Sequence, residues 1–360
     1  MEDSIESLPL QVSASASFAQ LLSQYRLSVL VSTYQAGKVI VLRAEGETLN
    51  LHFRNFPKAM GIAGNAGRLA VGTHHGIQQL YNLPAVCDKL PQDLPHDACY
   101  ILRNSHITGD IDIHEMVWAG DELWFVNTRF SCLCTLDPAY SFVPQWRPPF
   151  LQALTPDDRC HLNGLALRDN QPTYITALGQ TDEPQGWREQ RTVGGILMDI
   201  RSNEVITGGL AMPHSPRWYE DKLWVLESGR GTLAQIDDRT GQRVEVAHFS
   251  GFTRGLDFWQ HWAFVGLSQV RQSMVFGGLP LTERLTPDER FCGLQVVNLH
   301  TGQIEAYLKF ESGVQEIFAV QVLPGICFPE ILPSDDPLVG TSYSLSPEGL
   351  KQVPATLRRD

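Results

Sequence analysis

Short apolar segments alternate with clusters of Gly, Asn and Asp along most of the chain. The clusters AGNAG, AGDE, DDRTGQ and LHTGQ are of the kind that form tight turns between antiparallel strands. The pattern therefore predicts many short antiparallel strands and little helix. The best helical segment is Ser17–Tyr25, an amphipathic stretch in which Ser17 is expected to act as the N-terminal cap.

An internal repeat predicts the architecture. HEMVWAGDELWFVNTRFSCLCTLD at His114–Asp137 matches HSPRWYEDKLWVLESGRGTLAQID at His214–Asp237 without a gap, at a distance of 100 residues. The match includes two tryptophans. Two units of about 50 residues fit this distance, and units of that size are typical of β-propeller blades made of four antiparallel strands.

Four further units show the same order of strands and turns. Three of them begin at Lys58, at His161 and at Phe252. The sixth is split, because Gly313–Gly325 supplies an inner strand whereas the N-terminal segment supplies the other three. The chain is therefore expected to be an all-β, six-bladed β-propeller, closed by N-terminal strands that pair with a C-terminal inner strand. Such closure removes exposed sheet edges.

The domain organisation follows from these units. We expect an N-terminal extension with a short helix at 1–25, a single propeller at 26–335 and a C-terminal tail at 336–360. The blades are expected near 26–57 plus 313–325, 58–113, 114–160, 161–213, 214–251 and 252–312.

Alignment of the six predicted inner strands brings three histidines into one column. The first residues of these strands are Lys58, His114, His161, His214, Phe252 and Val314. Inner strands of a propeller begin at one face of the ring, so these side chains are expected around one mouth of the central channel. The fifth column is apolar in all six strands and is expected to form the core between blades.

Two interpretations of the histidines remain open. His114, His161 and His214 could bind a divalent transition metal, with Glu115 or Glu316 completing the coordination, or they could polarise a substrate directly. Alternatively, each imidazole could hydrogen-bond the backbone of a neighbouring blade and stabilise the packing.

Other polar residues are predicted at the same mouth. Arg129, Arg217 and Arg254 could hold a carboxylate or phosphate, or could instead pair with Glu227 or Glu316 and close the channel. Asn127, Asn163 and Glu227 are further candidates for ligand binding. His74, in the turn THHG, could act as a general base, although plain exposure to solvent is the favoured interpretation for such a turn.

Two insertions are expected to fold over this mouth as lids or recognition surfaces. They are residues 179–195 and 268–291. Their apolar residues could also form the surface of a noncatalytic protein-interaction platform. These residues are Trp187, Met274, Val275, Phe276 and Leu279.

Charge limits the classes of partner. The net charge of −12 and the pI near 5.4 disfavour binding to nucleic acid or to an anionic membrane surface. The acidic N-terminus MEDSIESLPL lacks the pattern of a secretory signal, which predicts a cytoplasmic protein. A small-molecule or peptide ligand, or a protein partner, is expected instead.

The motifs HEMVW, HLNGLA, GGIL, PHSPRW, LWVLESGRG and FTRGLDF resemble those of a bacterial family of conserved hypothetical proteins, a domain of unknown function sometimes fused to tetratricopeptide repeats. The resemblance covers the chain from about Phe18 to Ser346. More distantly, the layout is similar to the six-bladed gluconolactonase and regucalcin group, which implies a divalent cation held by acidic and amide ligands. Histidines stand here where carboxylates are expected, which disfavours calcium.

These observations lead to two functional hypotheses. In the first, the propeller binds a small anionic ligand at one channel mouth and acts as a metal-dependent hydrolase, lyase or cyclase, with His114, His161, His214 and Glu115 as candidate catalytic residues. In the second, the insertions bind a protein partner and the histidines are structural.

Overall fold

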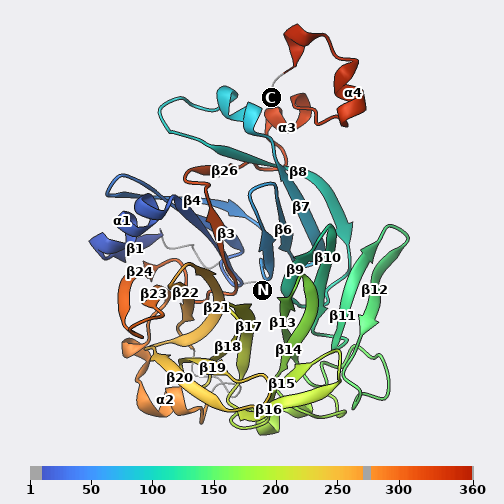
Figure 1. Cartoon of the computed structure of the whole chain (residues 1–360), viewed down its shortest axis with the longest axis vertical. Helices are drawn as coiled ribbons and strands as arrows, with labels where there is room; N and C mark the ends of the chain where they lie inside the picture. The colour runs from blue at the N-terminus through green and yellow to red at the C-terminus, as the bar shows by residue number, and fades with distance from the viewer. Residues whose placement is uncertain (1–9, 271–276, 359–360) are drawn as a thin grey trace, which may run out of the picture.

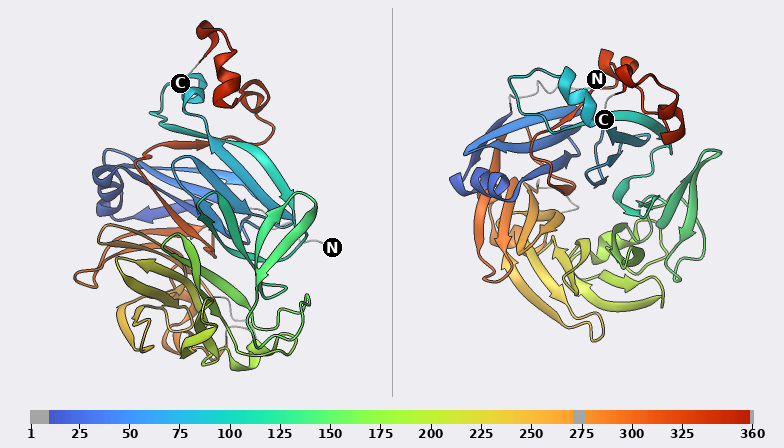
Figure 2. Two further views of the ribbon diagram at one scale, coloured as in Figure 1. Left: turned by 45° about the vertical axis from the view of Figure 1, so that its right-hand side comes forward. Right: turned by 45° about the horizontal axis from the view of Figure 1, so that its top comes forward.

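The computed structural model describes residues 10–270 and 277–358. Six mainly antiparallel sheets surround a central channel as the blades of a propeller (Figure 1; Figure 2, right). The inner strands are β25 (Val320–Pro324), β5 (Ile62–Gly64), β9 (Ile113–Ala119), β13 (Leu162–Arg168), β17 (Pro213–Tyr219) and β21 (Phe252–Trp259). The predicted six-bladed fold is confirmed.

The remaining strands complete the blades from the channel outward. The second strands are β2 (Leu27–Thr33), β6 (Arg68–Gly72), β10 (Glu122–Asn127), β14 (Gln171–Ala177), β18 (Lys222–Glu227) and β22 (Trp262–Ser268). The third strands are β3 (Lys38–Glu45), β7 (Gly76–Asn82), β11 (Cys132–Asp137), β15 (Gly195–Asp199), β19 (Thr232–Ile236) and β23 (Gly293–Asn298). The fourth strands are β4 (Thr48–Asn55), β8 (Ala98–Ile107), β12 (Tyr140–Trp146), β16 (Glu204–Leu210), β20 (Arg243–His248) and β24 (Ile304–Ser312).

The ring closes as the sequence predicts. β25, near the C-terminus, is the inner strand of the sheet whose other strands are the N-terminal β2, β3 and β4, and Val29 pairs with Val322. Two sheets also gain a fifth strand that the sequence analysis did not identify. β1 (Gln11–Ala14) pairs with β24, and β26 (Pro329–Ile331) pairs in parallel with β8.

The hydrophobic core lies in layers between neighbouring blades. Successive side chains of a strand point to opposite faces, so each central strand contributes to two layers. In β2, Val29 and Val31 pack with Phe264 of one neighbouring blade, whereas Leu30 packs with Leu69 of the other. This double burial explains why the central strands are apolar at nearly every position.

Short helices lie outside the strands. They are α1 (Ala16–Tyr25), η1 (Pro84–Lys89), η2 (Gly186–Gln190), α2 (Pro280–Arg284), η3 (Pro287–Glu289), α3 (Pro337–Thr341), α4 (Pro347–Lys351) and η4 (Ala355–Leu357). The tail that carries α3 and α4 projects from one edge of the ring, beyond β7 and β8 (Figure 2, left). Within the described ranges, no helix is both long enough and apolar enough to span a membrane.

The predicted N-terminal cap of α1 was wrong by two residues. Ser15 is the capping residue, and Ser17 lies inside the helix, where its hydroxyl donates to the Glu305 carbonyl at 2.8 Å. The amide of Phe18 donates to the Ser15 carbonyl. The helix begins earlier because Ser15 is also joined to β24 through Tyr307, whose amide donates to its hydroxyl oxygen at 3.1 Å.

Candidate functional site

His114 is the second residue of the inner strand β9 and is buried. Its Nδ1 lies 2.8 Å from the Thr128 hydroxyl oxygen and 3.2 Å from the Asp112 carbonyl oxygen. The Thr128 hydroxyl donates its own proton to the Leu162 carbonyl of the next blade, at 2.6 Å. It can therefore only accept from His114, which places the proton on Nδ1 and leaves Nε2 with a lone pair in the neutral ring.

His214 repeats this arrangement in β17. Its Nδ1 lies 2.8 Å from the Ser228 hydroxyl oxygen and 3.0 Å from the Met212 carbonyl oxygen. The Ser228 hydroxyl in turn donates to the Thr253 carbonyl of the next blade. The internal repeat of the sequence thus extends to the hydrogen bonds of the two histidines.

Both imidazoles are held in the neutral form. Burial, followed by nearby positive charge, lowers the pKa of His114 and of His214 well below the usual value. The guanidinium of Arg254 contributes to the lowered pKa in both cases. Neither Nε2 has a hydrogen-bond partner within the described segments, and neither is fully enclosed.

The sequence alignment placed His161 at the same inner-strand position as His114 and His214, and this prediction was wrong. The amide of Leu178 donates to the carbonyl of His161, as the amide of Thr128 donates to that of Asp112. His161 therefore corresponds to Asp112, just before the inner strand, and Asn163 holds the strand position of the other two histidines. The backbone of His161 is left-handed, with φ of 51°, which is uncommon for a residue other than glycine.

His161 nevertheless reaches the same site. Its ring contacts that of His114, with a distance of 4.8 Å between ring centroids, and lies 4.4 Å from the Trp187 ring. Nδ1 lies 2.9 Å from both carboxylate oxygens of Asp158, and Trp187 Nε1 donates to the same carboxylate at 3.0 Å. Asp158 was missed by the sequence analysis, although it precedes His161 by three residues.

Aromatic rings link the histidines to Arg254. The Phe318 ring lies 5.0 Å from that of His114, and the guanidinium carbon of Arg254 lies 3.6 Å from the Phe318 centroid. His214 contacts Phe252, which is two residues before Arg254 in β21. We call this end of the channel, defined by the three histidines, Arg254 and Phe318, the histidine end.

The structure does not support the predicted three-histidine metal site. No group of three or more His, Cys, Asp or Glu side chains is arranged to hold a metal ion in the described part of the chain. His161 contacts His114, but no ring contact joins His214 to either of them in residues 10–270 and 277–358.

The Arg254 side chain makes no hydrogen bond or ion pair to any described residue, and Phe318 covers one face of its guanidinium. Burial lowers the pKa of Arg254 to about 10, so the side chain stays charged near neutral pH. Glu316 is near enough to oppose this lowering, but its carboxylate forms no ion pair with Arg254. The histidine end therefore contains a cation without a direct partner in the described chain.

Arg217 behaves differently, because it spans the channel to Glu115. Its two terminal nitrogens lie 3.0 and 3.3 Å from the two carboxylate oxygens of Glu115, which belongs to the blade two positions away. Both side chains are largely buried. Glu115 was predicted as a catalytic or metal-binding residue, and the structure uses it to neutralise Arg217.

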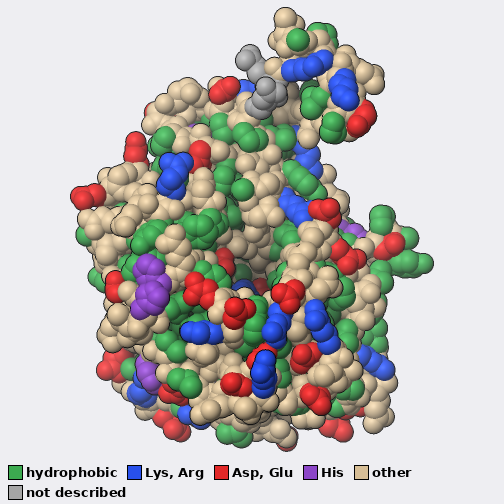
Figure 3. Space-filling model, viewed as in Figure 1, with side chains coloured by type: hydrophobic (Ala, Val, Ile, Leu, Met, Phe, Trp, Pro, Cys, Tyr) green, Lys and Arg blue, Asp and Glu red, His purple; other side chains and the backbone are tan. Residues whose placement is uncertain are grey.

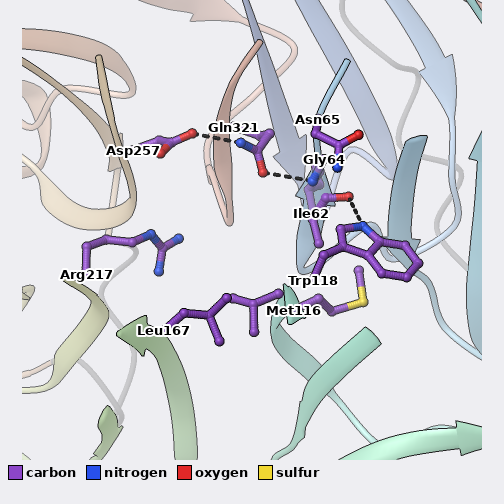
Figure 4. Close-up of a pocket in the computed structure, with 11 residues that line it drawn as sticks. Ile62, Gly64, Asn65, Met116, Trp118, Leu167, Arg217, Asp257 and Gln321 are labelled. Carbon is purple, nitrogen blue, oxygen red and sulfur yellow. Dashed lines mark hydrogen bonds between the residues drawn. The ribbon is translucent and has the colours of Figure 1, made fainter. Parts of the chain in front are cut away.

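A cavity of about 240 Å³ lies beyond this ion pair, among the later residues of the inner strands. Arg217 points into it, and Asp257 accepts a hydrogen bond of 2.8 Å from Gln321 at its side (Figure 4). Burial raises the pKa of Asp257 to about 6. Charged side chains of both signs also gather around the centre of the ring in the space-filling view (Figure 3).

Three predicted ligand-binding residues have structural partners instead. The Asn163 amide donates to the Pro213 carbonyl at 3.0 Å and accepts from Thr176 at 2.7 Å, which joins two blades. The Asn127 side-chain oxygen accepts from the Phe130 amide in a turn. Glu227 is fully buried and pairs with two arginines, Arg230 and Arg243.

Arg129 and His74 belong to a charged network at the side of the histidine end. Asp110 is its centre, because Lys58 lies 2.6 Å, Arg129 3.2 Å and His74 3.6 Å from its carboxylate oxygens. Lys58 also binds Asp112 at 2.7 Å. The arginine of this network is thus paired, unlike Arg254.

The two insertions pack against each other. Trp187 of the first and Leu279 and Leu281 of the second form one buried cluster with Met212 and Phe252. Trp187 and Leu279 therefore do not provide the exposed surface considered for a protein partner. Met274, Val275 and Phe276, which were predicted to belong to that surface, lie outside the described residues.

Solved structures resemble this fold at low sequence identity. A chain of the nidogen/laminin complex matches with a TM-score of 0.52 and 9% identity, over 84% of this chain and 100% of that one. A protein of unknown function from Bacteroides caccae matches with a TM-score of 0.51 and 9% identity, over 83% and 98%. Virginiamycin B lyase from Staphylococcus aureus matches with a TM-score of 0.41 and 12% identity, over 67% and 73%. The first two similarities concern the fold alone.

No curated protein matches the chain in sequence. A family model matches residues 16–332, which include the four main strands of every blade and all the side chains of the histidine end. The resemblance of the sequence motifs to a domain of unknown function is thereby confirmed, whereas the relation to the gluconolactonase and regucalcin group stays a prediction. The chain belongs to the family described as a domain of unknown function, DUF4915.

Proposed function

We propose that this propeller binds a small anionic ligand at the histidine end of its channel. The observation that carries the proposal is the unpaired guanidinium of Arg254. Arg254 is only partly exposed, and even partial removal of a cation from bulk water is costly unless hydrogen bonds or an opposite charge compensate. The face of Phe318 compensates only in part, because a cation–π contact contributes on the order of 0.5–2 kcal/mol.

The geometry around Arg254 suits an anion. A guanidinium donates in its own plane and forms paired hydrogen bonds with carboxylates and phosphates. Phe318 stacks on the face of the group, so the in-plane donors are not used by that contact. The neighbouring His114 and His214 are neutral and add no negative charge that would satisfy Arg254.

Substitution of Arg254 tests the proposal. Calorimetric titration with succinate, malate and inorganic phosphate is expected to detect binding to the wild-type protein, and Arg254→Met should weaken it at least 10-fold. Arg147, an exposed residue just after β12, offers the matched control Arg147→Met. Equal binding by the two variants, or no binding of any small oxyanion at millimolar concentration, would contradict the proposal.

Asp158 and His161 support proton transfer as the chemistry of this site. The carboxylate accepts from Nδ1 and is fixed on its other side by Trp187. Carboxylate–histidine pairs of this kind orient the imidazole and stabilise its charged form, so that Nε2 can act as a general base. The proton would pass from a ligand bound at Arg254 to His161 and return, without any co-reactant.

Proton exchange tests this chemistry. Each anion that binds is incubated with the protein in deuterated water, and replacement of its carbon-bound hydrogen is followed by NMR. Asp158→Asn should slow the exchange by 10-fold or more, whereas Asp157→Asn, which removes the adjacent carboxylate bound to Arg159, should leave it unchanged. Absence of exchange for every bound anion would show that the site only binds.

A further inference from the structure

We infer that the ligand of the histidine end is an oxyanion that carries hydroxyl groups beside its charged group. The inference rests on the proposed function, because the oxyanion is the part that Arg254 would hold. The hydroxyl groups are inferred from separate observations, namely which ring nitrogens of His114 and His214 carry their protons and which remain open.

Two neutral imidazoles present acceptors at this site. The Nδ1 atoms of His114 and His214 each donate to a hydroxyl oxygen and a backbone carbonyl. The hydroxyls of Thr128 and Ser228 cannot reverse these bonds, because each donates to a carbonyl of the next blade. Both Nε2 atoms are consequently acceptors, and a ligand that fits them must bring hydrogen-bond donors.

The position of Arg254 decides between donor groups and a metal ion. Its positive charge acts on both imidazoles, because it lowers the pKa of each. A metal dication bound at Nε2 would be repelled by the same guanidinium, whereas a hydroxyl group would not. The two functions are then complementary: Arg254 donates to the oxyanion, and His114 and His214 accept from the hydroxyls.

One other arrangement would also use these groups. Binding of an anion could protonate the imidazoles, which would then act as donors and hold the charge together with Arg254. That arrangement needs uptake of protons and no hydroxyl group. The enclosed position of both rings opposes it, since burial is the largest cause of their lowered pKa.

Matched ligand pairs separate these possibilities. Malate and succinate differ by one hydroxyl group, as do lactate and propionate. Glycerol 3-phosphate and propyl phosphate extend the comparison to phosphate esters. Titration calorimetry at pH 7.5 is expected to show at least 10-fold tighter binding of the hydroxylated member of the carboxylate pairs, the phosphate pair, or both. A preference of this size is expected because a site that hydrogen-bonds a hydroxyl group discriminates strongly against an analogue that lacks it. Whether the carboxylate or the phosphate pair shows the preference identifies the class of oxyanion.

Variants and buffers complete the test. His114→Phe should remove most of the preference for the hydroxylated member while the deoxy anion still binds, and His214→Leu provides a second variant if the first does not fold. Heats measured in two buffers of different ionisation enthalpy should agree, because no proton is taken up. Weak binding of all anions would overturn the proposed function itself. Equal binding within each pair, proton uptake, or binding of Zn²⁺ alone that is lost in His114→Phe would overturn only the present inference.

Discussion

The central channel contains two arginines in different states. Arg217 lies in the middle, where both terminal nitrogens contact Glu115 across the ring. Arg254 lies at the histidine end, where a phenylalanine ring is its main contact. The difference separates two uses of a partly buried cation. A paired cation links distant blades, whereas an unpaired one is available to a ligand.

The largest effect should come from breaking the pair. Glu115→Gln leaves Arg217 without its counter-charge and is expected to lower the free energy of unfolding by about 3–5 kcal/mol. Urea unfolding followed by tryptophan fluorescence measures this loss. The double variant Glu115→Leu with Arg217→Met removes both charges and should recover most of the stability. If Glu115→Gln costs no more than a surface substitution, the ion pair does not stabilise the ring.

The two regions should also respond to pH with opposite sign. The pKa of Asp257 is raised from 3.8 to about 6 by burial. The folded state therefore binds more protons than the unfolded state between these values, and stability falls as the pH rises through that window, by on the order of 1–3 kcal/mol. Asp257→Asn should abolish this slope when urea midpoints are compared from pH 4 to 7.

The histidine end has the reverse dependence. The pKa values of His114 and His214 are lowered below 6.5 in the folded state. Below pH 6.5 the unfolded state therefore binds more protons than the folded state. The contribution of the two neutral imidazoles to the free energy of unfolding is complete above pH 6.5 and is lost as the pH falls below it. In the Asp257→Asn background, stability should therefore decrease steadily on acidification. A flat profile would show that these imidazoles are not held neutral.

Smaller effects should follow from removing the hydroxyls that fix the imidazoles. Thr128→Val and Ser228→Ala each remove one of the two acceptors for Nδ1 and the donor to the next blade, and each is expected to cost about 1–2 kcal/mol. Thr48→Val, at an exposed position in β4, is the control. Unequal losses in the free energy of unfolding at Thr128 and Ser228 would show that the two hydroxyls do not stabilise their blades equally, although their hydrogen bonds match in geometry.

The sequence predicted those parts of the structure that repeat. The match of His114–Asp137 with His214–Asp237 predicted the blades, because strands and turns recur with the same spacing. Asp237 directly follows β19, and its side chain accepts from the amides of Arg239 and Thr240. Such local bonds depend on neighbours in the chain, so the sequence pattern reveals them.

The site was harder to predict because it depends on contacts between blades. His161 was aligned with His114 by residue type, but backbone hydrogen bonds place it two positions earlier in its blade. The pairing of Arg217 with Glu115 joins residues 102 positions apart, and nothing in either blade alone indicates it. Asp257 could have been noticed, since FTRGLDF places a carboxylate between the apolar residues Leu256 and Phe258 of an inner strand.

The smallest change in stability is expected for Arg254→Met. Because the guanidinium has no ion pair to lose, its replacement by an apolar side chain of similar length should alter the free energy of unfolding by less than about 1 kcal/mol, and in the stabilising direction if desolvation exceeds the contact with Phe318. Urea unfolding midpoints of Arg254→Met and Glu115→Gln, measured under the same conditions, compare the two losses of stability directly. A loss as large as that of Glu115→Gln would mean that Arg254 supports the ring in the same way as Arg217, and the assignment of the two arginines to separate roles would then fail.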